Sequence, residues 1–171
     1  MEIPEDSPIA DGKLDQEELG RAAAAGQHQL VRLTEQATEE YTEILKRDGK
    51  AVPAAWMLLG DGETIKRLNL GEQAKDAPAN MRILMYRAAL KSVARRGQIN
   101  AAVILYTGKL DEDTAMDAIV IEHEHRLGIS GNKVVPFELE AGKVSYFQSV
   151  TKEKPFMIFY DGQGSNPAGQ S

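Results

Sequence analysis

Small and apolar residues recur at a helical spacing over the first third of the chain. No proline lies between Asp15 and Asp48, and Gly49 follows as a typical helix end. The pattern therefore predicts one long amphipathic helix over about residues 15–48, with Gly20 and Gly26 as the points where it could break. The residues that recur at steps of three or four are Leu19, Ala23, Gly26, Leu30, Leu33, Ala37, Tyr41 and Ile44.

This helix is longer than the domain to which it would belong. At 1.5 Å per residue, about 32 residues give roughly 48 Å, whereas a small domain is about 30 Å across. The helix must therefore kink, project beyond the domain or pair with another chain. Pairing would explain the long apolar stripe, and the expected contact surface consists of Leu19, Leu30, Leu33, Tyr41 and Ile44.

The rest of the chain alternates between extended apolar segments and glycine-bearing turns. Residues 52–59 and 63–70 flank Gly60-Asp61-Gly62 and predict a β-hairpin whose first strand is apolar on both faces. A second, well-buried helix is predicted from Asp76 and Pro78 to just before Gly97. Further strands are predicted over 99–106, 116–127, 134–140, 144–149 and 156–160, with Pro136 placing its strand at an edge or a bulge.

This order of elements predicts an α+β fold with a mostly antiparallel sheet. A long helix, two strands, a second helix and a meander would form a single domain over 14–160, with disordered segments at 1–13 and 161–171. The strand-strand-helix-meander order resembles the layout of profilin-like and roadblock-like domains. That resemblance, which is one of element order alone, implies a binding role.

Composition narrows the classes of function. The 171 residues carry a formal net charge of −6 and include no cysteine, which excludes disulfides, thiolate metal sites and cysteine nucleophiles. The acidic balance makes nucleic acid an unlikely partner, because phosphate backbones favour a surplus of Lys and Arg. The sequence shows neither a secretory signal nor an apolar run long enough to span a membrane, so we expect a cytoplasmic protein without a membrane partner.

Two histidines stand two residues apart in the segment predicted as a strand over 116–127. Alternation places His123 and His125 on one face of that strand, with Glu122, Glu124 and Arg126 on the other. Two imidazoles at this spacing could hold zinc or another transition metal, although no third ligand is evident. The alternative is a strand end at which the histidines face a partly wet rim and the charged residues form cross-strand ion pairs, and we favour it.

The second predicted helix is strongly basic within an acidic chain. From Ala77 to Gln98 it carries five cations and no acid, and Arg87, Lys91 and Arg95 form one ridge at intervals of four residues. The ridge could bind a small anion or a nucleotide. The alternative, which we favour, is that it faces acids of the same molecule, for which the glutamates of the first helix are candidates, or simply water.

The sequence therefore favours a protein-protein interaction or adaptor protein that self-associates through its first helix. A metal-dependent enzyme or metal-binding protein centred on His123 and His125 is the second hypothesis, and anion binding at the basic ridge is the third. No cofactor is expected under the first hypothesis, and no nucleophile or acid–base pair stands out as catalytic.

Overall fold

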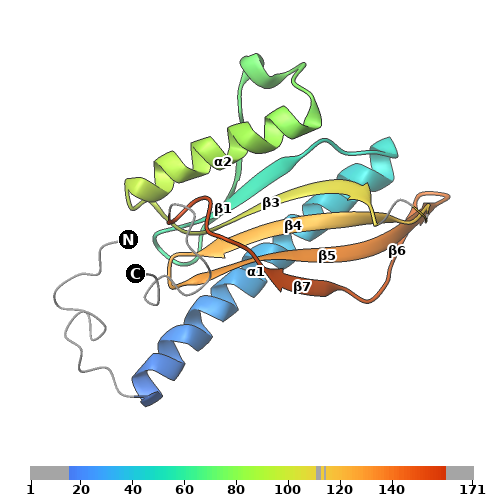
Figure 1. Cartoon of the computed structure of the whole chain (residues 1–171). Helices are drawn as coiled ribbons and strands as arrows, with labels where there is room; N and C mark the ends of the chain where they lie inside the picture. The colour runs from blue at the N-terminus through green and yellow to red at the C-terminus, as the bar shows by residue number, and fades with distance from the viewer. Residues whose placement is uncertain (1–15, 111–112, 114, 161–171) are drawn as a thin grey trace.

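The computed structural model describes residues 16–110, 113 and 115–160, so the predictions for 1–13 and 161–171 lie outside the described residues. Within them the chain has the predicted α+β architecture, with two helices and a long antiparallel sheet (Figure 1). In chain order the elements are α1 (Gln16–Asp48), β1 (Ala54–Leu59), β2 (Ile65–Leu68), the 3-10 turn η1 (Glu72–Ala74), α2 (Ala79–Arg95), β3 (Ile99–Lys109), β4 (Asp117–His125), β5 (Ile129–Glu140), β6 (Lys143–Tyr146) and β7 (Val150–Glu153).

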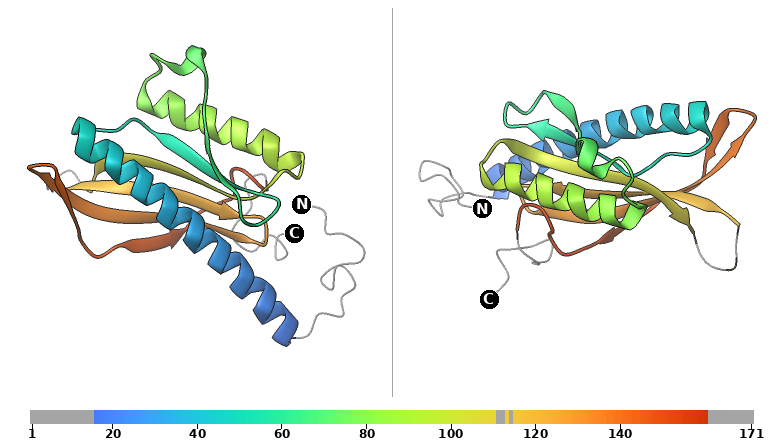
Figure 2. Two further views of the ribbon diagram at one scale, coloured as in Figure 1. Left: turned by 180° about the vertical axis from the view of Figure 1, so that it is seen from behind. Right: turned by 90° about the horizontal axis from the view of Figure 1, so that it is seen from above.

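The sheet lies between two layers of unequal size. Its strand order is β2-β1-β3-β4-β5-β6, and β7 pairs with the first half of β5. The second helix, α2, covers one face near β1 and β3, while α1 crosses the opposite face diagonally (Figure 2). As predicted from its two apolar faces, β1 is an interior strand, and Trp56 at its centre is fully buried.

The first helix runs without a break through both glycines. Its buried stripe packs on the sheet from Leu30 onward, whereas its first turns project beyond the sheet edge (Figure 2). Gly26 stands where the helix crosses the end of β4, and a Cβ there would lie 3.3 Å from Leu127 and 3.4 Å from the His125 ring. A glycine at this position therefore lets α1 approach the strand closely. The buried residues of the stripe are Leu30, Leu33, Ala37, Tyr41 and Leu45.

The last part of the chain differs from the prediction. The apolar segment 156–160 is not a strand. Residues 150–153 form β7 instead, and the segment after it folds back over the α2 face of the sheet, where Phe156 and Ile158 are buried. Its apolar residues therefore reflect burial of an irregular segment, which sequence periodicity does not distinguish from a short strand.

The prediction that Pro136 marks an edge strand or a bulge is also wrong, because β5 lies between β4 on one side and β6 and β7 on the other, and its register with β4 continues through Pro136 without a shift. Pro136 falls between the residues paired with β7, which end at Val134, and those paired with β6, which begin at Phe137. The Pro136 carbonyl accepts a hydrogen bond from the Phe147 amide. Because the nitrogen and the carbonyl of one strand residue point to the same side, the Pro136 nitrogen also faces the space between the stretches paired with β7 and β6, and no hydrogen bond of the β4–β5 ladder is lost.

The second helix is less buried than its apolar residues suggest. Only Tyr86 and Leu90 are fully buried in α2, and the outer face exposes Met81 and Leu84 by about half of their area, 49% and 54%. The sheet surface that a single helix covers is narrow, which explains why the wide apolar face of α2 is not all used.

Candidate functional site

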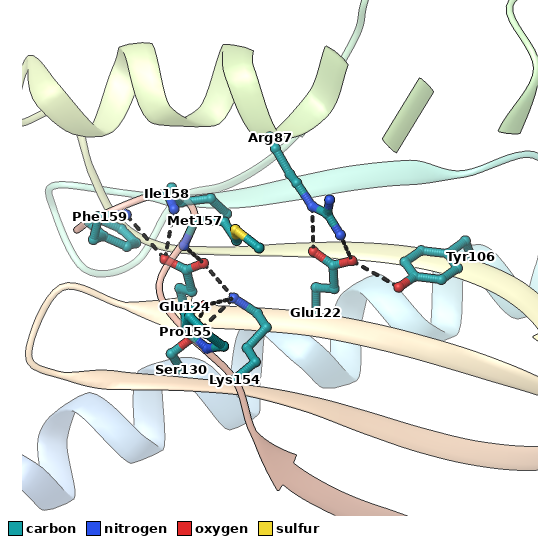
Figure 3. Close-up of polar contacts among 10 residues, drawn as sticks. All are labelled: Arg87, Tyr106, Glu122, Glu124, Ser130, Lys154, Pro155, Met157, Ile158 and Phe159. Atoms are coloured by element: carbon teal, nitrogen blue, oxygen red, sulfur yellow. Dashed lines mark hydrogen bonds and ion pairs between the residues drawn. The ribbon is translucent and has the colours of Figure 1, made fainter. Parts of the chain in front are cut away.

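The glutamates of β4 lie on the α2 face of the sheet and are almost completely buried (Figure 3). The Glu122 carboxylate accepts hydrogen bonds from the guanidinium of Arg87, at 3.0 and 2.5 Å, and from the Tyr106 hydroxyl at 2.8 Å. This forked ion pair ties α2 to the sheet. Burial, followed by the negative charge of Glu122, raises the pKa of the Tyr106 hydroxyl well above its usual value, so the phenol stays a donor.

Glu124 holds the end of the chain in place. Its carboxylate accepts hydrogen bonds from the amides of Met157, Ile158 and Phe159, at 2.8, 3.0 and 3.1 Å, and contacts the ammonium of Lys154 at 2.5 Å (Figure 3). The Lys154 side chain is itself only 8% exposed. Four donors on one buried carboxylate leave no free acceptor for a substrate, so Glu124 serves the fold rather than acid–base chemistry.

The two histidines lie on the opposite, α1 face, as alternation predicts. His125 is buried and uses both ring nitrogens inside the chain. The Leu127 amide donates to Nδ1 at 3.1 Å, which makes Nε2 the protonated nitrogen that donates to Gln29 at 2.8 Å. Desolvation lowers the pKa of this imidazole to about 4. A metal could reach His125 only by breaking one of these bonds.

His123 is partly buried and lies against Gly131 of β5. A Cβ at Gly131 would fall 2.8 Å from His123 Nε2 and 2.8 Å from the backbone carbonyl oxygen of Lys152 in β7. Because that backbone oxygen cannot move aside as a side chain could, this close approach requires glycine. Desolvation is the main cause that lowers the pKa of His123 to about 4. Among the described residues no group of three or more His, Cys, Asp or Glu side chains is placed to hold a metal ion.

The basic ridge of α2 does not face the glutamates of α1, because the two helices lie on opposite faces of the sheet. The prediction of an acidic partner within the same molecule is confirmed for Arg87, but the candidate glutamates of α1 are not that partner. The acid that faces the ridge is Glu122 of β4, which pairs with Arg87. Lys91 and Arg95 also have interactions of their own, so the ridge is not a row of three unpaired cations.

The residues predicted to contact another chain are mostly used inside the domain. Leu30, Leu33 and Tyr41 are 4%, 0% and 0% exposed and pack on the sheet, and Ile44 is half-buried. The backbone of Leu19 belongs to the projecting part of α1, but its side chain lies outside the described residues. The stripe that suggested a dimer is thus covered by the domain's own sheet from Leu30 onward.

A groove runs beside α1 on the part of the sheet that the helix leaves uncovered. Three cavities of about 440, 180 and 430 Å³ follow one another between α1 and the strands β5, β6 and β7. The first two share Lys133 and Thr34, and the last two share His123 and Thr151, so the cavities form one continuous feature. We call it the α1 groove.

One wall of the α1 groove is a regular ladder on the helix. A Thr-Glu pair recurs every four residues, so the three pairs stand above one another on one face. The ladder lines the largest cavity together with Lys46, Lys133 and Tyr146. A hydrogen bond between the Thr42 and Tyr146 hydroxyls ties β6 to the helix at this end. The ladder residues are Thr34, Glu35, Thr38, Glu39, Thr42 and Glu43.

The sequence contains this repeat, although its apolar period alone did not indicate it. The signal that could have found it is the spacing of threonine and glutamate along the helix, read separately from the hydrophobic stripe. What the sequence could not provide is the opposing wall, because Lys133, Tyr146 and Thr151 reach the helix only through the pairing of β5 with β6 and β7.

Compared with known proteins, the chain matches no protein-family model, no curated protein and no solved structure. The likeness to profilin-like and roadblock-like domains therefore stays one of element order. None of the helices in the described ranges is both long enough and apolar enough to cross a membrane. The α1 groove is the most extended concave feature among those described above.

Proposed function

We propose that this protein is a binding module that takes up an extended segment of a partner protein in the α1 groove. The observation that carries the proposal is the continuity of the three cavities along one helix. They follow α1 from Gln27 to Lys46, which at 1.5 Å per residue is about 28 Å. An extended chain rises about 3.3 Å per residue, so the groove would accommodate roughly eight residues.

The lining favours a peptide over a compact apolar ligand. Most of the side chains that line the groove end in hydroxyl, amide or charged groups, while their aliphatic parts together with Leu30, Val31, Ile129 and Tyr146 supply apolar surface. A peptide brings backbone donors and acceptors that such a surface can satisfy, whereas small-molecule sites are usually enclosed and mostly apolar. The strand β7 lines the same groove and is exposed at all four positions. Within the described ranges it pairs with β5 alone, so its outer edge can receive a further strand.

The proposal is tested by selecting displayed random 12-residue peptides on the immobilised full chain. Enriched peptides should bind the wild type and lose affinity for Thr38→Arg, which places a long cation inside the groove. Amide chemical shifts of the labelled full chain should move at Thr34, Lys133 and Thr151 when such a peptide is added.

A matched control is Leu84→Arg, which adds the same side chain on the opposite face of the sheet, where Leu84 is 54% exposed. It should leave peptide affinity unchanged. The proposal is wrong if no peptide is enriched, or if the enriched peptides bind Thr38→Arg as well as they bind the wild type.

Self-association through α1 stays a prediction, and the structure restricts where it can occur. The buried stripe is occupied from Leu30 onward, so a second copy would have to contact the projecting turns of α1 or the exposed Val31. Sedimentation velocity over a concentration series decides this point. A single monomer mass at all concentrations would exclude a homodimer, and the groove proposal does not depend on the result.

A further inference from the structure

The ladder on α1 has a repeat that matches an extended chain. Successive Thr-Glu pairs are four residues apart, which on a helix corresponds to an axial distance of about 6 Å. In a β-strand the side chains that share one face are two residues apart, or about 6.6 Å. Measured along the axis over the three Thr-Glu pairs, the helix repeat and the strand repeat differ by only about 1 Å in total, which flexible side chains can absorb.

The charge on this ladder is negative and largely unused. Glu35, Glu39 and Glu43 are exposed and line the same cavity of about 440 Å³. Glu43 contacts Lys46 at 3.4 Å, whereas neither Glu35 nor Glu39 forms an ion pair with another described residue. The wall therefore offers carboxylates at a strand-like spacing inside a concave site, and the threonine hydroxyls between them can accept or donate hydrogen bonds.

From this match we infer that the segment bound in the α1 groove is an extended strand with a basic residue at every second position. The inference rests on the proposed function and specifies its ligand. Alternate Lys or Arg side chains of the strand would face Glu35, Glu39 and Glu43 in register. The cationic part of the bound strand is limited to about three alternate positions by Lys133, which lines both this cavity and the next. A further cation of the strand would there meet the like charge of Lys133.

Two peptides of identical composition separate register from net charge. In Lys-Ser-Lys-Ser-Lys-Ser-Ser the three cations share one face of an extended chain, whereas in Lys-Ser-Ser-Lys-Ser-Ser-Lys neighbouring cations point to opposite faces. Each is titrated into the labelled full chain at low ionic strength and followed by amide chemical shifts. The first peptide should bind about fivefold tighter, because it forms two more exposed ion pairs.

A triple variant of the ladder should bind the alternating peptide about tenfold more weakly and should bind both peptides with equal affinity. It combines Glu35→Gln, Glu39→Gln and Glu43→Gln. The matched control replaces three acids outside the α1 groove, Glu72→Gln, Glu138→Gln and Glu140→Gln, with the same change in net charge. This control should keep the difference between the peptides.

The outcomes distinguish this inference from the groove itself. Equal affinity of the two peptides for the wild type would overturn the register match. If library peptides bind the groove but carry no alternating cations, the ligand chemistry is wrong while the binding module stands. If no peptide in either experiment shifts the amides of the groove, both proposals are wrong.

Discussion

Glu124 and Lys154 form the most deeply buried charged pair among the described residues, and each depends on the other. Replacing Glu124 with Gln turns one acceptor oxygen into a donor and leaves the Lys154 ammonium, 8% exposed, without its counter-charge. We expect Glu124→Gln to lower the free energy of unfolding by about 3–5 kcal/mol, measured by urea denaturation. Adding Lys154→Met should recover part of this loss because it removes the stranded charge.

Glu122→Gln provides the matched comparison on the same face of the same strand. The side chain of its partner Arg87 is 28% exposed, so the guanidinium can turn to water when the carboxylate is lost. The cost should therefore be smaller, about 1–2 kcal/mol. Equal costs for the two substitutions would contradict the view that burial of the partner decides the penalty.

His125 should make the stability of the protein fall as the pH drops below 6.5. Its pKa is about 4 in the fold, against an ordinary value of 6.5, so between these values the unfolded chain binds a proton that the folded chain does not. The loss from this group alone is about 2 kcal/mol between pH 7 and pH 5. Urea denaturation of His125→Asn, which keeps an acceptor for the Leu127 amide, should show a flatter profile.

His28 supplies the control, because it is an exposed histidine on α1, whereas His125 is buried in β4. The His28→Asn variant should retain the full loss of stability between pH 7 and pH 5. A profile equally steep in His125→Asn and in the wild type would show that other groups cause the acid sensitivity.

At the scale of the element, substitutions at a buried and at an exposed position of α1 distinguish whether its apolar stripe is core or contact surface. Leu33 is fully buried and Val31 is 42% exposed, two residues away on the same helix. Leu33→Asp should cost at least about 4 kcal/mol, because it removes a packed side chain and buries an unpaired charge, whereas Val31→Asp should cost less than about 1 kcal/mol. Thermal unfolding followed by circular dichroism measures both. A Leu33→Asp variant that is as stable as the wild type would show that the stripe is not core.

The elements themselves were largely predictable because their signals are local. The 3.6-residue period gave α1 its bounds to within about a residue, and Gly60-Asp61-Gly62 and Ala141-Gly142 marked hairpins that the structure confirms. The exceptions are segments whose secondary structure depends on the elements that pack against them in space. Residues 150–153 pair with β5 although they are polar and exposed, and 156–160 are buried without being a strand. Neither outcome follows from the local pattern, because both depend on pairing and packing at a distance.

At the scale of the whole molecule, the sequence predicted the helix that borders the groove but not the groove itself. The glutamates of α1 were visible in the chain, but they were considered only as candidate partners for the cations of α2, which the structure places across the sheet. The face on which a helix packs depends on the path of the connecting chain, and no local property of α1 or α2 encodes it. The groove exists because α1 crosses the sheet diagonally and leaves β5, β6 and β7 uncovered.

The two faces of the sheet are closed by different means, and this makes the last described segment essential. The α1 face is covered by a helix of 33 residues, while the α2 face needs both α2 and the segment from Lys154 to Tyr160. A chain truncated after Glu153 would lose the buried Phe156 and Ile158, each contributing about 1.5–3 kcal/mol, and also the hydrogen bonds and the ion pair that the final segment forms with Glu124. The two apolar side chains alone account for about 3–6 kcal/mol, which is a large part of the about 5–15 kcal/mol that stabilises an ordinary domain.

We therefore expect the chain of residues 1–153 to show collapsed amide dispersion in a two-dimensional NMR spectrum and no cooperative thermal transition. Tyr160→Phe in the full chain provides the comparison, because it removes only the hydrogen bond from the tyrosine hydroxyl to the Arg126 carbonyl and should cost about 1 kcal/mol. A native-like spectrum of the truncated chain would mean that α2 alone closes this face of the sheet. Glu124 would then be exposed to water in the truncated chain, and its carboxylate would no longer require the donors of the final segment.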